Sequence, residues 1–201
     1  MIVLRDIVQG TPEWMQLRCG SPGASSIDKI ITSTGKISAS REKYLYQMAG
    51  EKITGAKDES FSSGAMARGT EMEPKARQFF QIMTGLQVEE VGLVYPNELR
   101  QWHISPDGII IGQNKGLEIK CPLITTAVEY LLKGALPTVY KCQVQASMLC
   151  TGYESWFFMS YYPGLKPLII EVERDEKLIA LMKEAMEEFI FDLNELVKKL
   201  S

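Results

Sequence analysis

The clearest helical pattern lies between Thr70 and Thr84, where five apolar side chains recur at helical spacing and a glycine follows as a stop. Pro74 fits a helix only within the first turn, because its ring removes a backbone donor and clashes with the preceding turn. We therefore expect this helix to begin near Thr70, with Glu71 and Glu73 at its N-terminus.

Other segments carry separate helix and loop signals. Thr11-Pro12-Glu13 is a favourable start for a short helix that would end near Gly20, and Ser25 or Ser26 could cap a second helix. Small and polar residues predict mobile loops over 32–40 and 56–65. Further helices are expected over 41–55, 123–134, 138–152 and 176–200, the last of them long and amphipathic.

Extended segments are marked by apolar or alternating runs between turn residues. They cover residues 86–96, 101–111, 116–122, 154–163 and 166–175, with a turn at 112–116. Helices come first, followed by three strands, two helices, two strands and a final helix. This order predicts an α/β fold with a central sheet flanked by helices.

The 201 residues contain no repeat or low-complexity tract, and we expect one domain over 1–201. Within it, N-terminal helices would cover about 11–60, a core about 66–174 and a C-terminal helix about 175–200. The chain has neither a long apolar run nor a signal-peptide pattern at its start, which favours a cytoplasmic protein without a membrane segment.

Composition excludes some chemistry. The four cysteines form no CxxC pair and His103 is the single histidine, so a zinc site or a Cys–His catalytic pair is not expected. His103 itself is expected to pack or to support a site. A net charge of −3 argues against a protein that coats DNA, but it allows an enzyme with a local basic groove and an acidic metal site.

Three charged residues stand in an otherwise apolar stretch. Asp107 lies on a Pro-Asp-Gly corner, and Glu118 and Lys120 flank Ile119 in the next segment. Alternation along a strand sends Glu118 and Lys120 to one face and Ile119 to the other, so the acid of the corner can meet both. Two carboxylates suit Mg²⁺ or Mn²⁺, and a lysine beside them could orient a water for phosphodiester hydrolysis. The alternative is a hairpin with a solvated acid and a surface Glu–Lys pair.

Five motifs in order resemble the phage lambda exonuclease family, also called YqaJ-type viral recombinases, within the PD-(D/E)xK nuclease superfamily. They are EWMQLRCGSPGAS, RGTEMEPKA, SPDGI with GLEIKCP, YKCQVQASM and ERDEK, and together they extend over nearly the whole chain. The resemblance implies a PD-(D/E)xK core, meaning a restriction-endonuclease-like mixed sheet with flanking helices.

The resemblance also implies an active site. Asp107, Glu118 and the backbone carbonyl of Ile119 would bind Mg²⁺ or Mn²⁺, with Glu73 of the helix motif contributing to the metal site. Lys120 would be the catalytic lysine acting on the attacking water. For Glu73 the alternative is a carboxylate that only stabilises the start of its helix.

A second set of residues matches family positions near the 5′-phosphate end of the substrate. Arg18 and Ser25 belong to the N-terminal motif, and Gln143 is the first glutamine of the Gln-x-Gln motif. Arginine is a natural bidentate phosphate ligand, which agrees with this role. Met66 stands where the family uses an apolar wedge at the duplex end, although packing is an equal alternative. Trp14 is expected in the core.

The implied function is a metal-dependent 5′→3′ exonuclease. It would degrade one strand of linear double-stranded DNA from a 5′-phosphate end to mononucleotides, and it would act as a trimeric ring with a single-strand annealing protein as partner. The alternatives are another PD-(D/E)xK nuclease, such as an endonuclease or a Cas4-like protein, and a catalytically silent DNA-end-binding protein. Cas4-like proteins need cysteines for an iron–sulfur cluster, and the cysteine spacing here does not fit.

Overall fold

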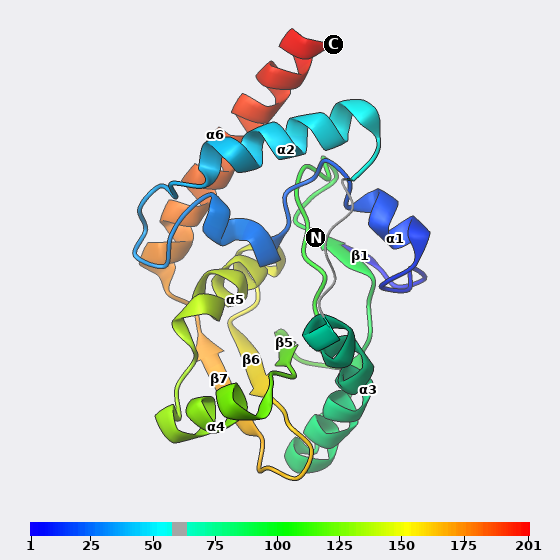
Figure 1. Ribbon diagram of the computed structural model, residues 1–201, viewed down its shortest axis with the longest axis vertical. Helices are drawn as coiled ribbons and strands as arrows, with labels where there is room; N and C mark the ends of the chain where they lie inside the picture. The colour runs from blue at the N-terminus through cyan, green and yellow to red at the C-terminus, as the bar shows by residue number, and fades with distance from the viewer. Residues whose placement is uncertain (58–63) are drawn as a thin grey trace.

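The protein is built on a five-stranded mixed sheet (Figure 1). The structure is a computed structural model that describes residues 1–57 and 64–201, without the side chains of residues 64–66. The strands lie in the order β2 (Val88–Glu89), β4 (Gly108–Ile110), β5 (Lys115–Lys120), β6 (Ser155–Ser160) and β7 (Leu168–Glu173). Only β5 and β6 run parallel, so the expected mixed sheet is confirmed.

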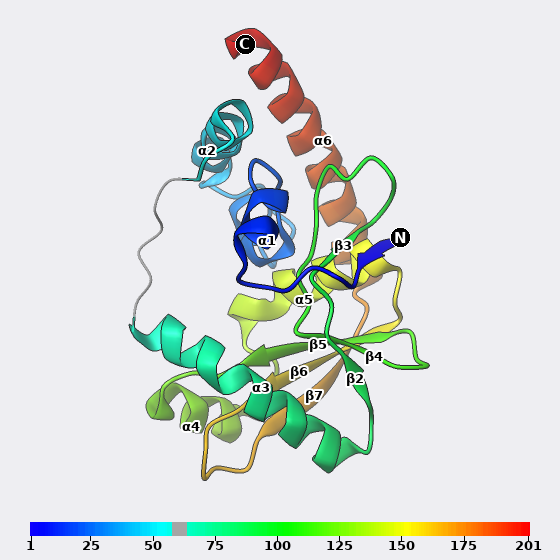
Figure 2. The same cartoon turned by 90° about the vertical axis from the view of Figure 1, so that its right-hand side faces the viewer.

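Helices cover both faces of this sheet, with α3 on one side and α5 on the other (Figure 2). Alternation along β5 and β6 explains both layers. Leu117 and Phe157 pack with Phe80 of α3, whereas Trp156 packs in the cluster that includes Val144 of α5. The bounds of the helices are α1 (Pro12–Leu17), η1 (Ala24–Lys29), α2 (Arg41–Thr54), α3 (Gly64–Thr84), α4 (Ile124–Lys133), α5 (Thr138–Thr151) and α6 (Glu176–Leu200).

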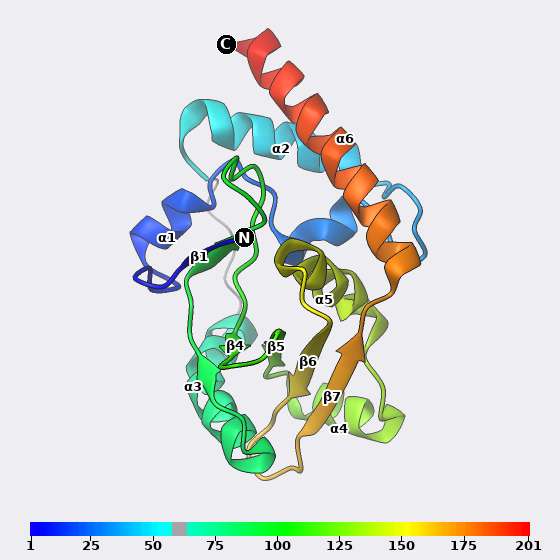
Figure 3. The ribbon, with the colours of Figure 1, turned by 180° about the vertical axis from the view of Figure 1, so that it is seen from behind.

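The long helix α6 leaves the sheet and packs against α2 (Figure 3). Tyr44 stacks on Phe189 with ring centroids 5.5 Å apart, and Arg41 donates to Asp192 at 2.7 Å. These contacts hold the N-terminal segment over the end of the sheet that carries the candidate site. No helix in the described residues is long and apolar enough to cross a membrane.

Helix α3 begins at Gly64, so the expected start near Thr70 is wrong. Pro74 lies inside the helix, and Glu71 and Glu73 lie beyond its first turn rather than at its N-terminus. A tertiary contact supports the additional turns, because Arg68 donates to the carbonyls of Cys121 and Pro122. The predicted loop over 56–65 falls partly on residues 58–63, which lie outside the described residues, and its last two residues are helical.

Three further segments differ from expectation because they pair with distant parts of the chain. Residues 24–29 form a 3₁₀ helix preceded by Gly23, so neither Ser25 nor Ser26 acts as its cap. Residues 86–96 form two short strands, since β3 (Leu93–Tyr95) leaves the main sheet and pairs with β1 (Ile2–Leu4). The strand expected over 101–111 is regular only at β4.

Candidate active site

Asp107 occupies the corner that precedes β4 and is tied to β5 at two points. The Ile119 N–H donates to Asp107 Oδ2 at 2.5 Å, and the Asp107 N–H donates to the Leu117 carbonyl at 3.1 Å. Burial raises the pKa of Asp107 well above its ordinary value, and the charges of Glu118 and Glu73 raise it further. The corner therefore presents a carboxyl beside other acids in a region largely shielded from water.

Glu118 lies on the face of β5 that looks toward α5, and it shares that face with Lys120, as the alternation predicts. It is 2% exposed, and its Oε1 accepts from Lys120 Nζ at 2.5 Å and from Gln143 Nε2 at 2.6 Å. Burial acts to lower the pKa of Lys120, but the charges of Glu118 and Asp107 outweigh it and raise that pKa, so the lysine is a cation. A buried carboxylate with a paired ammonium is thus placed next to Asp107.

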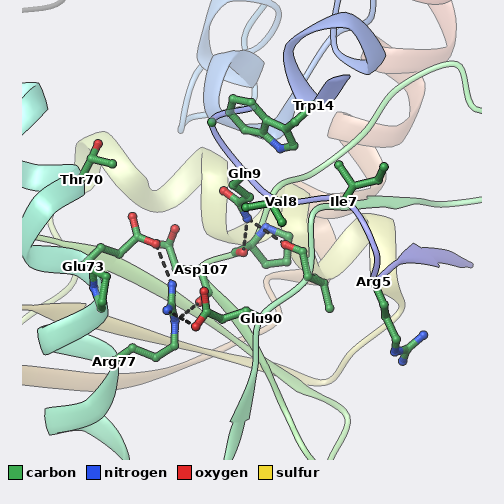
Figure 4. Close-up of a pocket in the computed structure, with 14 residues that line it drawn as sticks. Arg5, Ile7, Val8, Gln9, Trp14, Thr70, Glu73, Arg77, Glu90 and Asp107 are labelled. Atoms are coloured by element: carbon green, nitrogen blue, oxygen red, sulfur yellow. Dashed lines mark hydrogen bonds and ion pairs between the residues drawn. The ribbon is translucent and has the colours of Figure 1, made fainter. Parts of the chain in front are cut away.

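Glu73 reaches the same region from α3 (Figure 4). Its Oε1 accepts from Arg77 Nη2 at 2.8 Å. Burial raises the pKa of Glu73 and the charge of Glu118 adds to the shift, while Arg77 opposes both. The charge of Glu118 on β5 therefore acts on the carboxyl groups of both α3 and the corner before β4.

The chemistry of these donors fits a hard divalent cation. Asp107, Glu118 and Glu73 supply carboxylate oxygens, and Ile119 lines the cavity that also includes Glu73 and Asp107. Burial raises the pKa of both Asp107 and Glu73, and the neighbouring acids raise it further, which indicates negative charge that a cation would relieve. Within residues 1–57 and 64–201, however, no three His, Cys, Asp or Glu side chains are already arranged around a common metal position.

A cavity of about 160 Å³ connects the carboxylates to the second set of predicted residues. Its lining includes Arg18, Ser25 and Gln143 together with Asp107, Glu118 and Lys120. The structure thus brings together residues from α1's end, η1, α5 and β5 that are far apart in the sequence.

Arg18 is held in a defined orientation at this cavity. Its Nε donates to His103 Nε2 at 3.2 Å, and its guanidinium lies 3.9 Å from the centroid of the Trp14 ring. Among the described residues, its two terminal nitrogens have no hydrogen-bond partner. These nitrogens are the groups that an arginine uses to bind a phosphate in a bidentate manner.

Ser105 and Gln9 are among the residues of this cavity that sequence reasoning missed. The buried Ser105 Oγ has no hydrogen-bond partner in the described part of the chain, although buried hydroxyls are normally bonded. Gln9 lines the same cavity, and its Nε2 donates to the carbonyls of Val91 and Pro106 at 2.9 Å each. Ser105 stands two residues before Asp107, which is a signal that could have drawn attention to it.

Two residues close to predicted site positions, Gln145 and Glu71, are not part of the site. Gln145, the second glutamine of the Gln-x-Gln motif, is buried and bonded to the backbone of Glu173 and Asp175 rather than to the site. Glu71 does not line the cavities that include Glu73. Met66 belongs to α3, but its side chain lies outside the described residues, so its predicted wedge role stays a prediction.

A larger cavity of about 400 Å³ also borders Asp107 and Lys120. Glu73, Ile119 and Tyr140 contribute to its lining. Asp107 and Lys120 therefore belong to the walls of two cavities, one with the Arg18 guanidinium and one bordered by α3.

A mixed sheet that brings an aspartate corner together with a Glu-x-Lys strand defines the PD-(D/E)xK class of nuclease folds. A family model described as the YqaJ-like viral recombinase domain matches residues 13–154. The chain belongs to this family, as the five motifs predict. Membership of the family identifies it as a nuclease.

The proteins similar to this chain include solved structures and a curated relative. The alkaline exonuclease LHK-Exo of Laribacter hongkongensis is 33% identical, with a TM-score of 0.85 over 94% of this chain and 96% of that one. A phage-related exonuclease of Haemophilus somnus 129PT, at 16% identity, shares the fold with a TM-score of 0.68 over 93% of this chain and 100% of that one. The uncharacterized protein ExoD of Escherichia coli (strain K12) is 33% identical over 69 residues, which are 33% of this chain and 79% of ExoD.

Proposed function

We propose that the protein is a metal-dependent 5′→3′ exonuclease that degrades one strand of linear double-stranded DNA to mononucleotides. The observation that carries this proposal is that Arg18, Asp107 and Glu118 line one and the same cavity. A site for a terminal phosphate next to a hydrolytic site limits cleavage to chain ends. Similarity to the alkaline exonuclease LHK-Exo supports the exonuclease part of this proposal.

Asp107, Glu118 and the Ile119 carbonyl would hold Mg²⁺ or Mn²⁺, with Glu73 adding a carboxylate from α3. When bound, the ion would polarise the scissile phosphate and lower the pKa of the attacking water. Lys120 would orient that water and stabilise the charge that develops on the phosphate. Gln143 would hold Glu118 in place through its bond at 2.6 Å.

The 5′-phosphate would bind between Arg18, Ser25 and Ser105. The terminal nitrogens of Arg18 would meet two phosphate oxygens, while the Ser105 hydroxyl would gain the partner that the described residues do not provide. His103 and Trp14 fix the direction of Arg18 through its Nε and its flat face. Binding of a terminal phosphate therefore orders the first nucleotide with its 3′ bond toward Asp107 and Lys120.

The family resemblance extends the proposal to assembly and context. Three copies would form a ring around the DNA, and the 3′ single strand left behind would pass to a single-strand annealing protein. The setting would be the cytoplasm of a bacterial host, with a phage or prophage as the source. Met66 would wedge the duplex end in this arrangement.

The test uses linear duplex DNA labelled on either strand, with 5′-phosphate or 5′-hydroxyl ends, with and without Mg²⁺, and a Lys120→Ala variant beside the natural protein. We expect Mg²⁺-dependent release of mononucleotides, faster from 5′-phosphate ends. The Lys120→Ala rate should fall by roughly a hundredfold or more, because an electrostatic contact to the transition state is lost.

Controls separate the alternatives. Lys133, which forms an exposed ion pair with Glu129 on α4, provides a matched Lys133→Ala variant that should retain full activity. Cleavage of closed circles would identify an endonuclease, and digestion from 3′ ends would reverse the polarity. Metal-independent DNA-end binding without cleavage would favour the silent DNA-end-binding protein.

A further inference from the structure

Arg77 is a buried arginine that sequence analysis did not single out. It lies on α3 one turn after Glu73, and its side chain is 8% exposed. An arginine cannot lose its charge inside a protein, so burial is stable only if its donors are bonded. The identity of those partners therefore indicates what the residue does.

The guanidinium joins three segments of the chain (Figure 4). Nη2 donates to Glu73 Oε1 at 2.8 Å, and Nε donates to the Asp107 carbonyl at 2.8 Å. Nη1 pairs with Glu90 Oε1 at 2.7 Å, in the segment between β2 and β3. Two of the three partners belong to the candidate metal site, and the third is 72% exposed at its side chain.

These bonds complete the restraint of Asp107. Its carboxylate is held by the Ile119 N–H, whereas its carbonyl is held by Arg77. The flat fork of the guanidinium has a rigid geometry, so it sets the position of the α3 carboxylate relative to the Asp107 corner. A lysine could reach one of the two partners but could not reproduce both directions.

We infer that Arg77 is a positioning residue that sets the separation of Glu73 and Asp107 for metal binding. It does not touch the reacting atoms and acts through these two acids. This inference rests on the proposed function, since it requires that the acids bind a divalent ion. Outer contacts of this kind, when removed, typically weaken metal affinity by roughly 10–100-fold.

The experiment uses electron paramagnetic resonance to measure the binding of Mn²⁺ to the DNA-free protein. The variants are Arg77→Lys and Arg77→Gln, with Glu90→Gln as the matched control that changes only the outer partner. Melting temperatures in EDTA report folding separately. We expect both Arg77 variants to bind Mn²⁺ more weakly by roughly 10–100-fold, with Glu90→Gln close to the natural protein.

A double variant tests whether Arg77 acts through Glu73. If it does, Glu73→Gln combined with Arg77→Lys should lose less affinity than the product of the two single losses. Arg77→Lys retains the charge, so it remains informative should Arg77→Gln fail to fold.

The outcomes distinguish this inference from the proposed function. If the natural protein and Arg77→Lys bind Mn²⁺ equally while the melting temperature falls, Arg77 is only structural and the inference is wrong. If the natural protein binds no Mn²⁺, the metal-dependent function itself is wrong.

Discussion

At the scale of single residues, His103 shows how a buried side chain can orient a charged neighbour by accepting its hydrogen bond. Its Nε2 accepts from Arg18, so the proton of the neutral ring lies on Nδ1, which faces Ser21 Oγ at 3.1 Å. Burial lowers the pKa of His103 to about 3, and the charges of Arg18 and Lys57 add to this shift. The expectation that His103 packs or supports a site agrees with this arrangement.

The His103 shift predicts a pH dependence of stability. The pKa in the folded state is below the ordinary value of 6.5, so the unfolded chain takes up the proton first as the pH falls. The stabilising contribution is complete above about pH 6.5 and is lost toward about pH 3. Between about pH 7.5 and about pH 5 the loss should be roughly 2 kcal/mol.

Urea unfolding at a series of pH values checks this prediction. His103→Gln retains an acceptor for Arg18 but does not titrate, so its stability should fall less steeply over the same range. Parallel curves for the natural protein and the variant would show that His103 does not contribute to the acid sensitivity.

At the scale of secondary-structure elements, α5 separates two glutamines that are two residues apart. Gln143 donates to Glu118 in the candidate site, whereas Gln145 is bonded to the backbone of Glu173 and Asp175. Residues two apart on a helix do not face the same direction. The first glutamine of α5 therefore contacts the candidate site, and the second holds the connection between β7 and α6.

Replacement of each glutamine by methionine should separate these roles. Gln145→Met leaves a backbone carbonyl and a backbone N–H without their partner, which should cost about 1–3 kcal/mol of unfolding free energy. Gln143→Met should have the smaller effect on stability but should slow DNA cleavage, because Glu118 loses one of its two donors. Paired measurements of urea unfolding and nuclease rate decide this, and equal effects of both variants on both quantities would contradict it.

At the scale of the whole molecule, the net charge of −3 means that the proposed DNA substrate would have to be held by local cationic groups rather than by a general attraction. We propose Arg18, which lines the cavity, as one such group. A closed ring would retain the DNA between catalytic cycles without a strongly basic surface.

The ring proposal predicts a particle with three times the mass of one chain. Sedimentation equilibrium should show it without DNA, and a single encounter with labelled duplex should release many nucleotides in the presence of excess unlabelled competitor. A monomer that releases few nucleotides per encounter would remove the ring from the proposal but would leave the active site unaffected.

Local sequence patterns were sufficient to predict several features of this protein. The periodicity of residues 116–122 predicted that Glu118 and Lys120 share a face, because alternation depends only on the backbone of one strand. The order of elements predicted a sheet between helices, and five motifs predicted the family. Each of these features is encoded by residues that are close together in the chain.

Only the tertiary structure decided the features that depend on distant partners. Helix α3 extends through Pro74 with support from the carbonyls of residues 121–122, and residues 86–96 divide because β1 offers β3 a second sheet. The Arg77 contacts with Glu73, Asp107 and Glu90 likewise join three segments. Local sequence signals do not report such long-range pairing, because the free energy that stabilises it appears only when the chain has folded.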